Sequence, residues 1–97
     1  MCGILGLIHN NKYKISLEEF NQINNHLYNR GPDHQQTIDI NSNEQKLKLG
    51  HSRLSILDLT NLGNQPMSSY SGRFIISFNG EIYNHNILRK NINNEFN

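Results

Sequence analysis

The sequence has few of the residues that build disulfide scaffolds or membrane spans. Its 97 residues include one cysteine, no tryptophan and two prolines. One cysteine excludes an internal disulfide, and no Asn-x-Ser/Thr glycosylation site is present, so a reducing, cytoplasmic location is expected. No apolar run approaches the roughly 20 residues of a membrane-spanning helix.

The charged residues nearly cancel. Nine Lys and Arg against eight Asp and Glu leave a net charge of +1, and no block of one sign occurs. Electrostatics therefore gives no reason to expect nucleic acid or an anionic membrane as a partner. A chain of this length forms one small domain, and it contains no internal repeat.

The first third of the chain predicts a strand and a helix. Residues 3–8 form a short apolar run that suits a buried strand. Ser16 and Glu19 have the spacing of a capping box, and apolar residues then recur at helical spacing, which predicts a helix over residues 17–29. Pro32 excludes a helical conformation for the residue before it and so ends this helix.

The remainder predicts further strands and a second helix. Alternating residues at 37–40 and 46–49 indicate a hairpin, and residues 54–59 and 73–78 are strand candidates. A helix over residues 82–89, with Ile87 and Leu88 inward, places Asn79-Gly80 at a strand-to-helix junction. The polar tail at 91–97 has no closing element, so we expect an incomplete domain. The fold class is α+β.

The position of Cys2, directly after Met1, is the most informative feature of the chain. Removal of Met1 would leave a residue that is a nucleophile and also carries the chain's free α-amino group. Such an amine titrates near neutrality, so it can take the thiol proton and return it to a leaving group. Two alternatives are open: the position of this lone cysteine is accidental, or Cys2 is a small apolar residue that fills a place in a first strand.

Three further residues suit that chemistry. The Asn79 side-chain amide and the Gly80 backbone N–H are candidate oxyanion donors, and glycine permits the backbone to approach a substrate closely. Arg53 suits bidentate binding of a carboxylate, as an amino-acid substrate would require. The five histidines show no metal-ligand spacing with one another or with Cys2, so no metal site is expected.

Five motifs follow one another in a spacing that resembles a known family. They are Met1-Cys2-Gly3-Ile4, Arg30-Gly31-Pro32-Asp33, His51-Ser52-Arg53-Leu54-Ser55-Ile56, Gly63-Asn64-Gln65-Pro66-Met67 and Asn79-Gly80-Glu81-Ile82-Tyr83-Asn84. From Cys2 to about Arg89 the chain resembles the start of the glutamine-hydrolysing asparagine synthetases, a branch of the class II glutamine amidotransferases. Sister branches usually lack the proline of the second motif and the continuation after Gly80.

The resemblance implies an N-terminal-nucleophile hydrolase fold, an αββα sandwich of two antiparallel sheets, incomplete in this short chain. It implies that Cys2 attacks the side-chain amide of L-glutamine to form a thioester, which releases ammonia and then glutamate. Asn79 and Gly80 would form the oxyanion hole, and Glu81 would hold the substrate amino group. The segment Arg53, Leu54, Ser55, Ile56 and Leu57 would line the glutamine site, and Arg30 and Asp33 would brace it.

The resemblance also implies what the chain lacks. We expect residues 1–97 to be the N-terminal part of a glutamine amidotransferase domain, without the synthetase domain to which ATP and Mg would belong. No cofactor is expected in this chain, which has no Gly-rich phosphate loop. A synthetase domain or second polypeptide would then supply the missing half. Two alternatives stay open: a non-catalytic asparagine synthetase fragment that binds a partner, and a small glutamine-sensing module.

Overall fold

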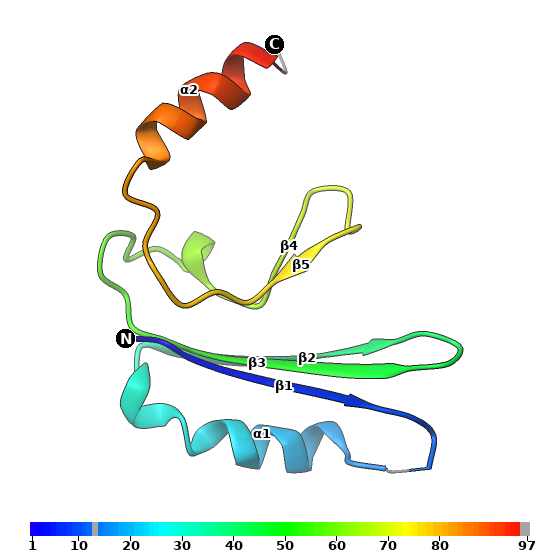
Figure 1. The fold of residues 1–97 in the computed structure, drawn as a ribbon. Coiled ribbons are helices and arrows are strands. Elements are labelled where there is room, and N and C mark those ends of the chain that lie inside the picture. The colour runs from blue at the N-terminus through cyan, green and yellow to red at the C-terminus, as the bar shows by residue number, and fades with distance from the viewer. Residues whose placement is uncertain (13, 96–97) are drawn as a thin grey trace.

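The fold is known from a computed structural model that describes residues 1–12 and 14–95 (Figure 1). Its elements are β1 (Gly3–His9), α1 (Leu17–Asn25), η1 (Tyr28–Arg30), β2 (His34–Asn41), β3 (Lys46–Arg53), η2 (Asn61–Gly63), β4 (Met67–Ser68), β5 (Ile75–Ile76) and α2 (His85–Glu95). Three strands form an antiparallel sheet in the order β1-β3-β2, and β4 and β5 form a second antiparallel pair. The predicted mixture of helices with antiparallel sheets is confirmed.

The elements lie in layers (Figure 1). α1 covers one face of the β1-β3-β2 sheet, the β4-β5 pair lies over the opposite face, and α2 extends beyond that pair. In the first sheet Gly3 of β1 pairs with Ser52 of β3. Because the two strands are antiparallel, the residue before Gly3 lies beside the residues that follow Ser52. This register brings Cys2 to the end of β3.

The helix α1 begins at the predicted capping box. The Ser16 hydroxyl accepts the Glu19 backbone N–H at 3.1 Å, and the Glu19 carboxylate accepts the Ser16 backbone N–H at 2.8 Å. Phe20 and Asn24 are buried against the sheet, where a side chain at Gly50 would lie 2.5 Å from the Asn24 side-chain oxygen. Glycine at this position of β3 therefore permits α1 to pack closely on the strand.

The helix is shorter than predicted. α1 ends at Asn25, and the His26 and Leu27 backbone N–H groups bond to carbonyls three residues back, which tightens the last turn. A separate 3-10 turn, η1, then leads into Gly31.

Two strand predictions need correction. Residues 54–59 are not a strand, because the loop from 54 to 60 turns around the Arg53 side chain, which binds the carbonyls of Asp58 and Thr60. The strand predicted over 73–78 is reduced to the two residues of β5, since β4 offers only Met67 and Ser68 for pairing. The predicted hairpin is confirmed and is longer than expected, with β2 and β3 paired from His34–Arg53 to Asn41–Lys46.

The last part of the chain also differs from expectation. α2 begins at His85, after Asn79-Gly80, and continues to Glu95, so the tail does not dissolve into irregular structure there. Ile87 and Leu88 do not face inward: their exposed fractions are 62% and 42%, because α2 extends away from both sheets (Figure 1). No helix of the described part is long and apolar enough to cross a membrane.

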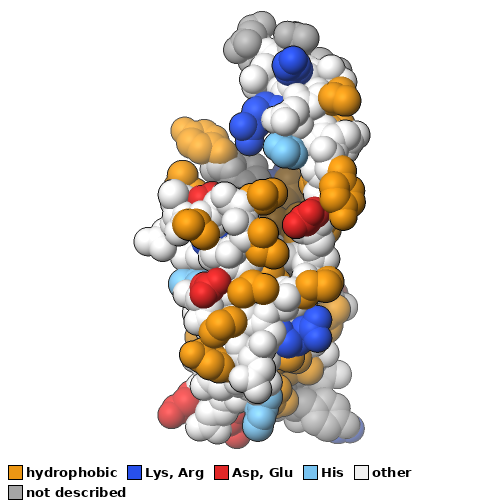
Figure 2. Space-filling view, turned by 90° about the vertical axis from the view of Figure 1, so that its left-hand side faces the viewer, with side chains coloured by type: hydrophobic (Ala, Val, Ile, Leu, Met, Phe, Trp, Pro, Cys, Tyr) orange, Lys and Arg blue, Asp and Glu red, His pale blue; other side chains and the backbone are white. Residues whose placement is uncertain are grey.

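Apolar side chains are exposed on the upper layer. Figure 2 shows hydrophobic side chains along one face of the molecule. Within residues 56–92, the large apolar residues that are more than half exposed are Ile56, Leu57, Leu59, Leu62, Tyr70, Phe74, Ile76, Ile82, Tyr83, Ile87 and Ile92. We call this set the upper apolar residues. A monomeric protein rarely leaves so many large apolar side chains in water.

Candidate active site

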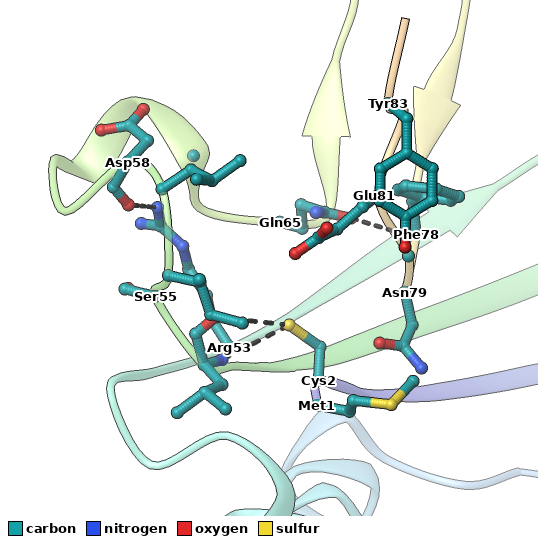
Figure 3. Close-up of a pocket in the computed structure, with 15 residues that line it drawn as sticks. Met1, Cys2, Arg53, Ser55, Asp58, Gln65, Phe78, Asn79, Glu81 and Tyr83 are labelled. Atoms are coloured by element: carbon teal, nitrogen blue, oxygen red, sulfur yellow. Dashed lines mark hydrogen bonds between the residues drawn. The ribbon is translucent and has the colours of Figure 1, made fainter. Parts of the chain in front are cut away.

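A cleft of about 480 Å³ lies between the end of β3 and the segment that follows β5 (Figure 3). Every residue that the sequence predicted for the site lines it: Cys2, Arg53, Leu54, Ser55, Ile56, Leu57, Asn79, Gly80 and Glu81. Residues from the start of the chain, the middle and the region near residue 80 thus meet in one place. Their roles in binding and catalysis stay predictions.

Cys2 lies at the bottom of the cleft, with Arg53 on one side and Asn79 on the other (Figure 3). Its thiol contacts the end of β3: the Leu54 backbone N–H donates to Sγ at 3.4 Å, and Sγ lies 3.8 Å from the Leu54 carbonyl. Met1 also lines the cleft and is largely exposed. Removal of Met1 would therefore open the cleft beside the thiol and place a free amine there.

Arg53 is buried and is held by the loop that follows it. Nη1 donates to the Thr60 carbonyl at 2.6 Å and to the Asn64 side-chain oxygen at 2.8 Å, and Nη2 donates to the Asp58 carbonyl. These bonds use three of the five guanidinium N–H donors. In the part of the chain that the structure describes, the one ion pair joins Lys48 and Asp39, so the Arg53 charge has no carboxylate partner there.

The acidic residue of this loop, Asp58, binds another loop residue with its carboxylate and not the Arg53 guanidinium. The Thr60 hydroxyl and backbone N–H donate to the Asp58 carboxylate at 2.7 and 2.8 Å. These hydrogen bonds lower the pKa of Asp58. The side chain of Asp58 therefore stabilises the turn of the loop, while its backbone carbonyl binds Arg53.

Asn79 and Gly80 lie in an irregular segment between β5 and α2. Asn79 and Gly80 follow a strand and precede a helix, as predicted. The helix begins only at His85, so the Gly80 N–H is not part of its first turn. The Phe78 ring covers Gly80, since a side chain at position 80 would lie 2.8 Å from it. The side chains of Glu81 and Gln65 lie above Cys2 (Figure 3).

Arg30 and Asp33 contact the backbone of the cleft, as expected for bracing residues. Arg30 Nε donates to the Cys2 carbonyl at 3.3 Å. The Ser55 backbone N–H donates to the Asp33 carboxylate at 2.7 Å. One contact fixes the residue that carries the thiol, and the other fixes the start of the loop after β3.

The structure adds residues that the sequence interpretation did not assign to the site. Gln65 lines the cleft, and Gly63 provides the space that the Arg53 guanidinium fills. Both belong to the fourth motif, which had no assigned role. His51, on β3, is fully buried and its Nε2 lies 3.2 Å from the Phe78 carbonyl. The sequence did carry a signal for His51. Side chains two residues apart on a strand point to the same face, so a strand through this motif places His51 on the face of Arg53.

Burial sets the charge state of His51. Loss of solvent lowers its pKa, more than the hydrogen bond to the Phe78 carbonyl raises it, and the positive charges of Arg53 and His34 lower it further. The imidazole is therefore neutral at neutral pH. Within residues 1–12 and 14–95, no three His, Cys, Asp or Glu side chains lie together as a metal site would require.

Comparison with known proteins identifies the family. Residues 1–97 match the glutamine amidotransferase domain. The chain is 38% identical to a protein of Methanocaldococcus jannaschii assigned as a glutamine-hydrolysing asparagine synthetase, over 98% of this chain and 21% of that protein. It is 36% identical to asparagine synthetase 1 of Bacillus subtilis, over 95% of this chain and 14% of that protein.

A relative with a different name matches as completely. The amidase chyE of Penicillium rubens is 34% identical over 99% of this chain and 15% of that protein. The chain thus spans about a fifth or less of the length of these curated relatives. No solved structure matches significantly. The family match over the whole sequence and the near-complete alignments agree, and the chain belongs to the glutamine amidotransferase domain family, in its asparagine synthetase-like branch.

Proposed function

We propose that this chain carries the glutaminase site of an asparagine synthetase-like protein and hydrolyses L-glutamine to glutamate and ammonia. The observation that carries the proposal is the meeting of the Cys2 thiol, the buried Arg53 guanidinium and the Asn79-Gly80 segment in one cleft. A nucleophile, a carboxylate-binding cation and hydrogen-bond donors are the parts that acyl transfer from an amino-acid amide requires.

The Arg53 guanidinium binds the α-carboxylate of glutamine. A buried positive charge without a carboxylate partner is costly, and an anionic ligand offsets that cost. Nε and one N–H of Nη2 remain available after the three loop contacts, which suits a side-on bidentate pair. Glu81, at the opposite side of the cleft, binds the substrate α-amino group, and residues 54–57 line the same cleft.

The chemical step begins after Met1 has been removed. The Cys2 amine takes the thiol proton, sulfur forms a bond to the amide carbon of the substrate, and the carbonyl electrons move onto oxygen. The Asn79 side-chain amide and the Gly80 N–H donate to that oxyanion, and each such donor is worth about 2.7–4 kcal/mol in related chemistry. When the C–N bond breaks, the amine returns its proton and ammonia leaves. Water then hydrolyses the thioester to glutamate and restores the thiol.

We propose the N-terminal-nucleophile sandwich as the complete fold. The observed order of α1, the three-stranded sheet and the β4-β5 pair supports the first three layers of such a sandwich (Figure 1). The chemistry needs no cofactor in this chain. ATP and Mg belong to the synthetase domain of the whole protein, which makes asparagine from aspartate. A reducing cytoplasm keeps a lone thiol such as that of Cys2 in its reduced form, which agrees with a cytoplasmic location.

The upper apolar residues support a second part of the proposal. Further polypeptide, on the same or another chain, completes the domain by covering these exposed side chains, because the chain spans only 14–21% of its curated relatives. The same observation favours the alternative that residues 1–97 alone bind without turnover. Ammonia release by the chain alone, compared with release after addition of the following region of a relative, separates the two.

The experiment that tests the site is the intact mass of the purified chain before and after exposure to 6-diazo-5-oxo-L-norleucine, a glutamine analogue that alkylates a nucleophilic thiol with loss of N₂. We expect one adduct, mapped to Cys2, on molecules that have lost Met1 and none on molecules that retain it. The unprocessed molecules are thus a control within the same sample. Absence of an adduct on the processed chain contradicts the proposal for this chain.

A further inference from the structure

His51 binds the backbone next to the predicted oxyanion residues without touching the cleft. The side chain has no exposed surface, and its Nε2 lies 3.2 Å from the Phe78 carbonyl oxygen. A carbonyl only accepts, so Nε2 must carry the proton. Nδ1 is then the unprotonated nitrogen, and it is buried without a hydrogen-bond partner in the described part of the chain. The lowered pKa of His51 agrees with this neutral tautomer.

Gln65 binds the other polar group of the same residue. The Phe78 backbone N–H donates to the Gln65 side-chain oxygen at 2.5 Å. Both backbone groups of Phe78 are therefore bound by side chains rather than by a neighbouring strand. The Phe78 ring also covers Gly80 closely. Phe78 thus connects two side chains from distant parts of the sequence to the segment that carries Asn79 and Gly80.

We propose that His51 and Gln65 are positioning residues that hold Phe78 from both sides and so set the place of Asn79 and Gly80 relative to Cys2. This inference rests on the proposed function, because it assigns the two residues to the oxyanion site of that reaction. Neither residue reacts: each acts through the Phe78 backbone. The segment needs such support because it is irregular and follows directly after the short strand β5.

The arrangement makes one strand responsible for both ends of the substrate. His51 and Arg53 lie two residues apart on β3, the central strand of its sheet, and share one face. Arg53 binds the α-carboxylate in the proposed function, and His51 holds the segment that binds the developing oxyanion. The spacing between His51 and Arg53 is fixed by β3, which is paired with β1 and β2 at His51 and with β2 at Arg53.

The test uses two variants of similar size that differ in one property. His51→Gln keeps an N–H donor at about the reach of Nε2, whereas His51→Met has a similar length and no donor. For His51→Met we expect Cys2 alkylation by 6-diazo-5-oxo-L-norleucine to slow by about 10- to 100-fold at saturating analogue. Displacement of a reacting or binding group by about 1 Å reduces the rate by up to about that much. The concentration for half-maximal rate should stay within about threefold in both variants, and His51→Gln should keep most of the rate.

A purely structural role gives a different pattern. The proposal is overturned if alkylation of Cys2 slows equally in both variants. It is also overturned if the saturating rate stays the same and only the analogue concentration for half-maximal rate rises. Unchanged rates in both variants overturn it as well. Circular dichroism checks that the variants fold, so that a slow rate is not caused by unfolding.

A second measurement does not depend on activity. ¹⁵N NMR of the unmutated chain should show His51 protonated on Nε2 and not on Nδ1 at pH 7. The Gly80 amide resonance should move in His51→Met and stay in His51→Gln, whereas the Gly6 amide stays in both. Protonation on Nδ1 overturns the inference. If the chain is not alkylated at all but these signals are found, the proposed function fails while the hold on Phe78 stands.

Discussion

The guanidinium of Arg53 occupies the space that a side chain at position 63 would fill. A β-carbon built on Gly63 would lie 2.2 Å from Nη2 and 2.7 Å from the central guanidinium carbon. Gly63 closes the loop that begins after Arg53, and the carbonyls of that loop hold the guanidinium. Glycine is therefore required at position 63, because the guanidinium of Arg53 lies close to the backbone there. The loop holds the guanidinium, and the guanidinium in turn fixes the shape of the loop.

Gly63→Ala should weaken substrate binding. The added methyl group displaces the guanidinium, and a lost charge-assisted hydrogen bond of about 1.5–3 kcal/mol corresponds to roughly a 10- to 100-fold change. We expect the analogue concentration for half-maximal alkylation of Cys2 to rise by at least about tenfold. Iodoacetamide, which needs no carboxylate site, should alkylate Cys2 at an unchanged rate. An unchanged concentration dependence would contradict the predicted displacement of the Arg53 guanidinium from the substrate site.

Cys2→Ser should abolish most of the reaction. A hydroxyl is a far weaker nucleophile than a thiol at neutral pH, and we expect glutamine hydrolysis to fall by at least about 100-fold. The measurement is ammonia release, under the conditions in which the unsubstituted protein is active. Cys2→Ala is the matched control for background hydrolysis. Activity of Cys2→Ser close to that of the unsubstituted protein would argue against the thioester mechanism.

Gly31→Ala should destabilise the fold. A β-carbon at position 31 would lie 2.2 Å from the Ser52 carbonyl oxygen, which belongs to the backbone of β3 and cannot move aside as a side chain can. Overpacking of this kind costs about 1–3 kcal/mol. We expect the urea midpoint to fall accordingly.

Gly6→Ala is the matched control for that substitution. Its β-carbon would meet Leu49 at 3.7 Å, an ordinary van der Waals contact, so the midpoint should change little. Equal effects of the two substitutions would contradict the close approach at Gly31.

Acid should destabilise the protein through His51. Burial, together with the positive charges of Arg53 and His34, lowers the pKa of His51 in the native state, whereas an unfolded histidine titrates near 6.5. Below about pH 6.5 the unfolded state therefore binds a proton that the native state does not, and the free energy of unfolding falls as the pH decreases.

The measurement is urea unfolding at pH 7 and pH 5 for the unsubstituted chain and for His51→Gln. The variant should lose less stability between the two pH values, because glutamine does not titrate. The same loss in both proteins would mean that other groups cause the acid sensitivity.

Local sequence signals predicted the local structure well. The capping box of Ser16 and Glu19 fixed the start of α1, since both of its hydrogen bonds lie within four residues. Alternation of apolar and polar side chains predicted the β2-β3 hairpin, because this pattern also lies within short stretches of the sequence. The region from 54 to 59 misled the periodicity argument, because its apolar residues line a loop that is shaped by a polar side chain, Arg53, which binds carbonyls five and seven residues later.

The helix after residue 82 shows another limit of periodicity. Its amphipathic pattern predicted that Ile87 and Leu88 face inward, but no other layer covers α2 in the described residues, and both side chains are exposed. A pattern indicates which face is apolar. What covers that face depends on the rest of the fold.

The sequence by itself determined the chemistry that is available and the family to which the chain belongs. Cys2, Arg53 and the Asn79-Gly80 pair are informative residue types, and five ordered motifs were enough to indicate the glutamine amidotransferase branch. Only the tertiary structure decided which groups hold these residues in place. The contacts of Cys2 with Leu54 and of His51 with Phe78 span 52 and 27 residues, and such pairings depend on strand register and loop packing, which local patterns do not encode.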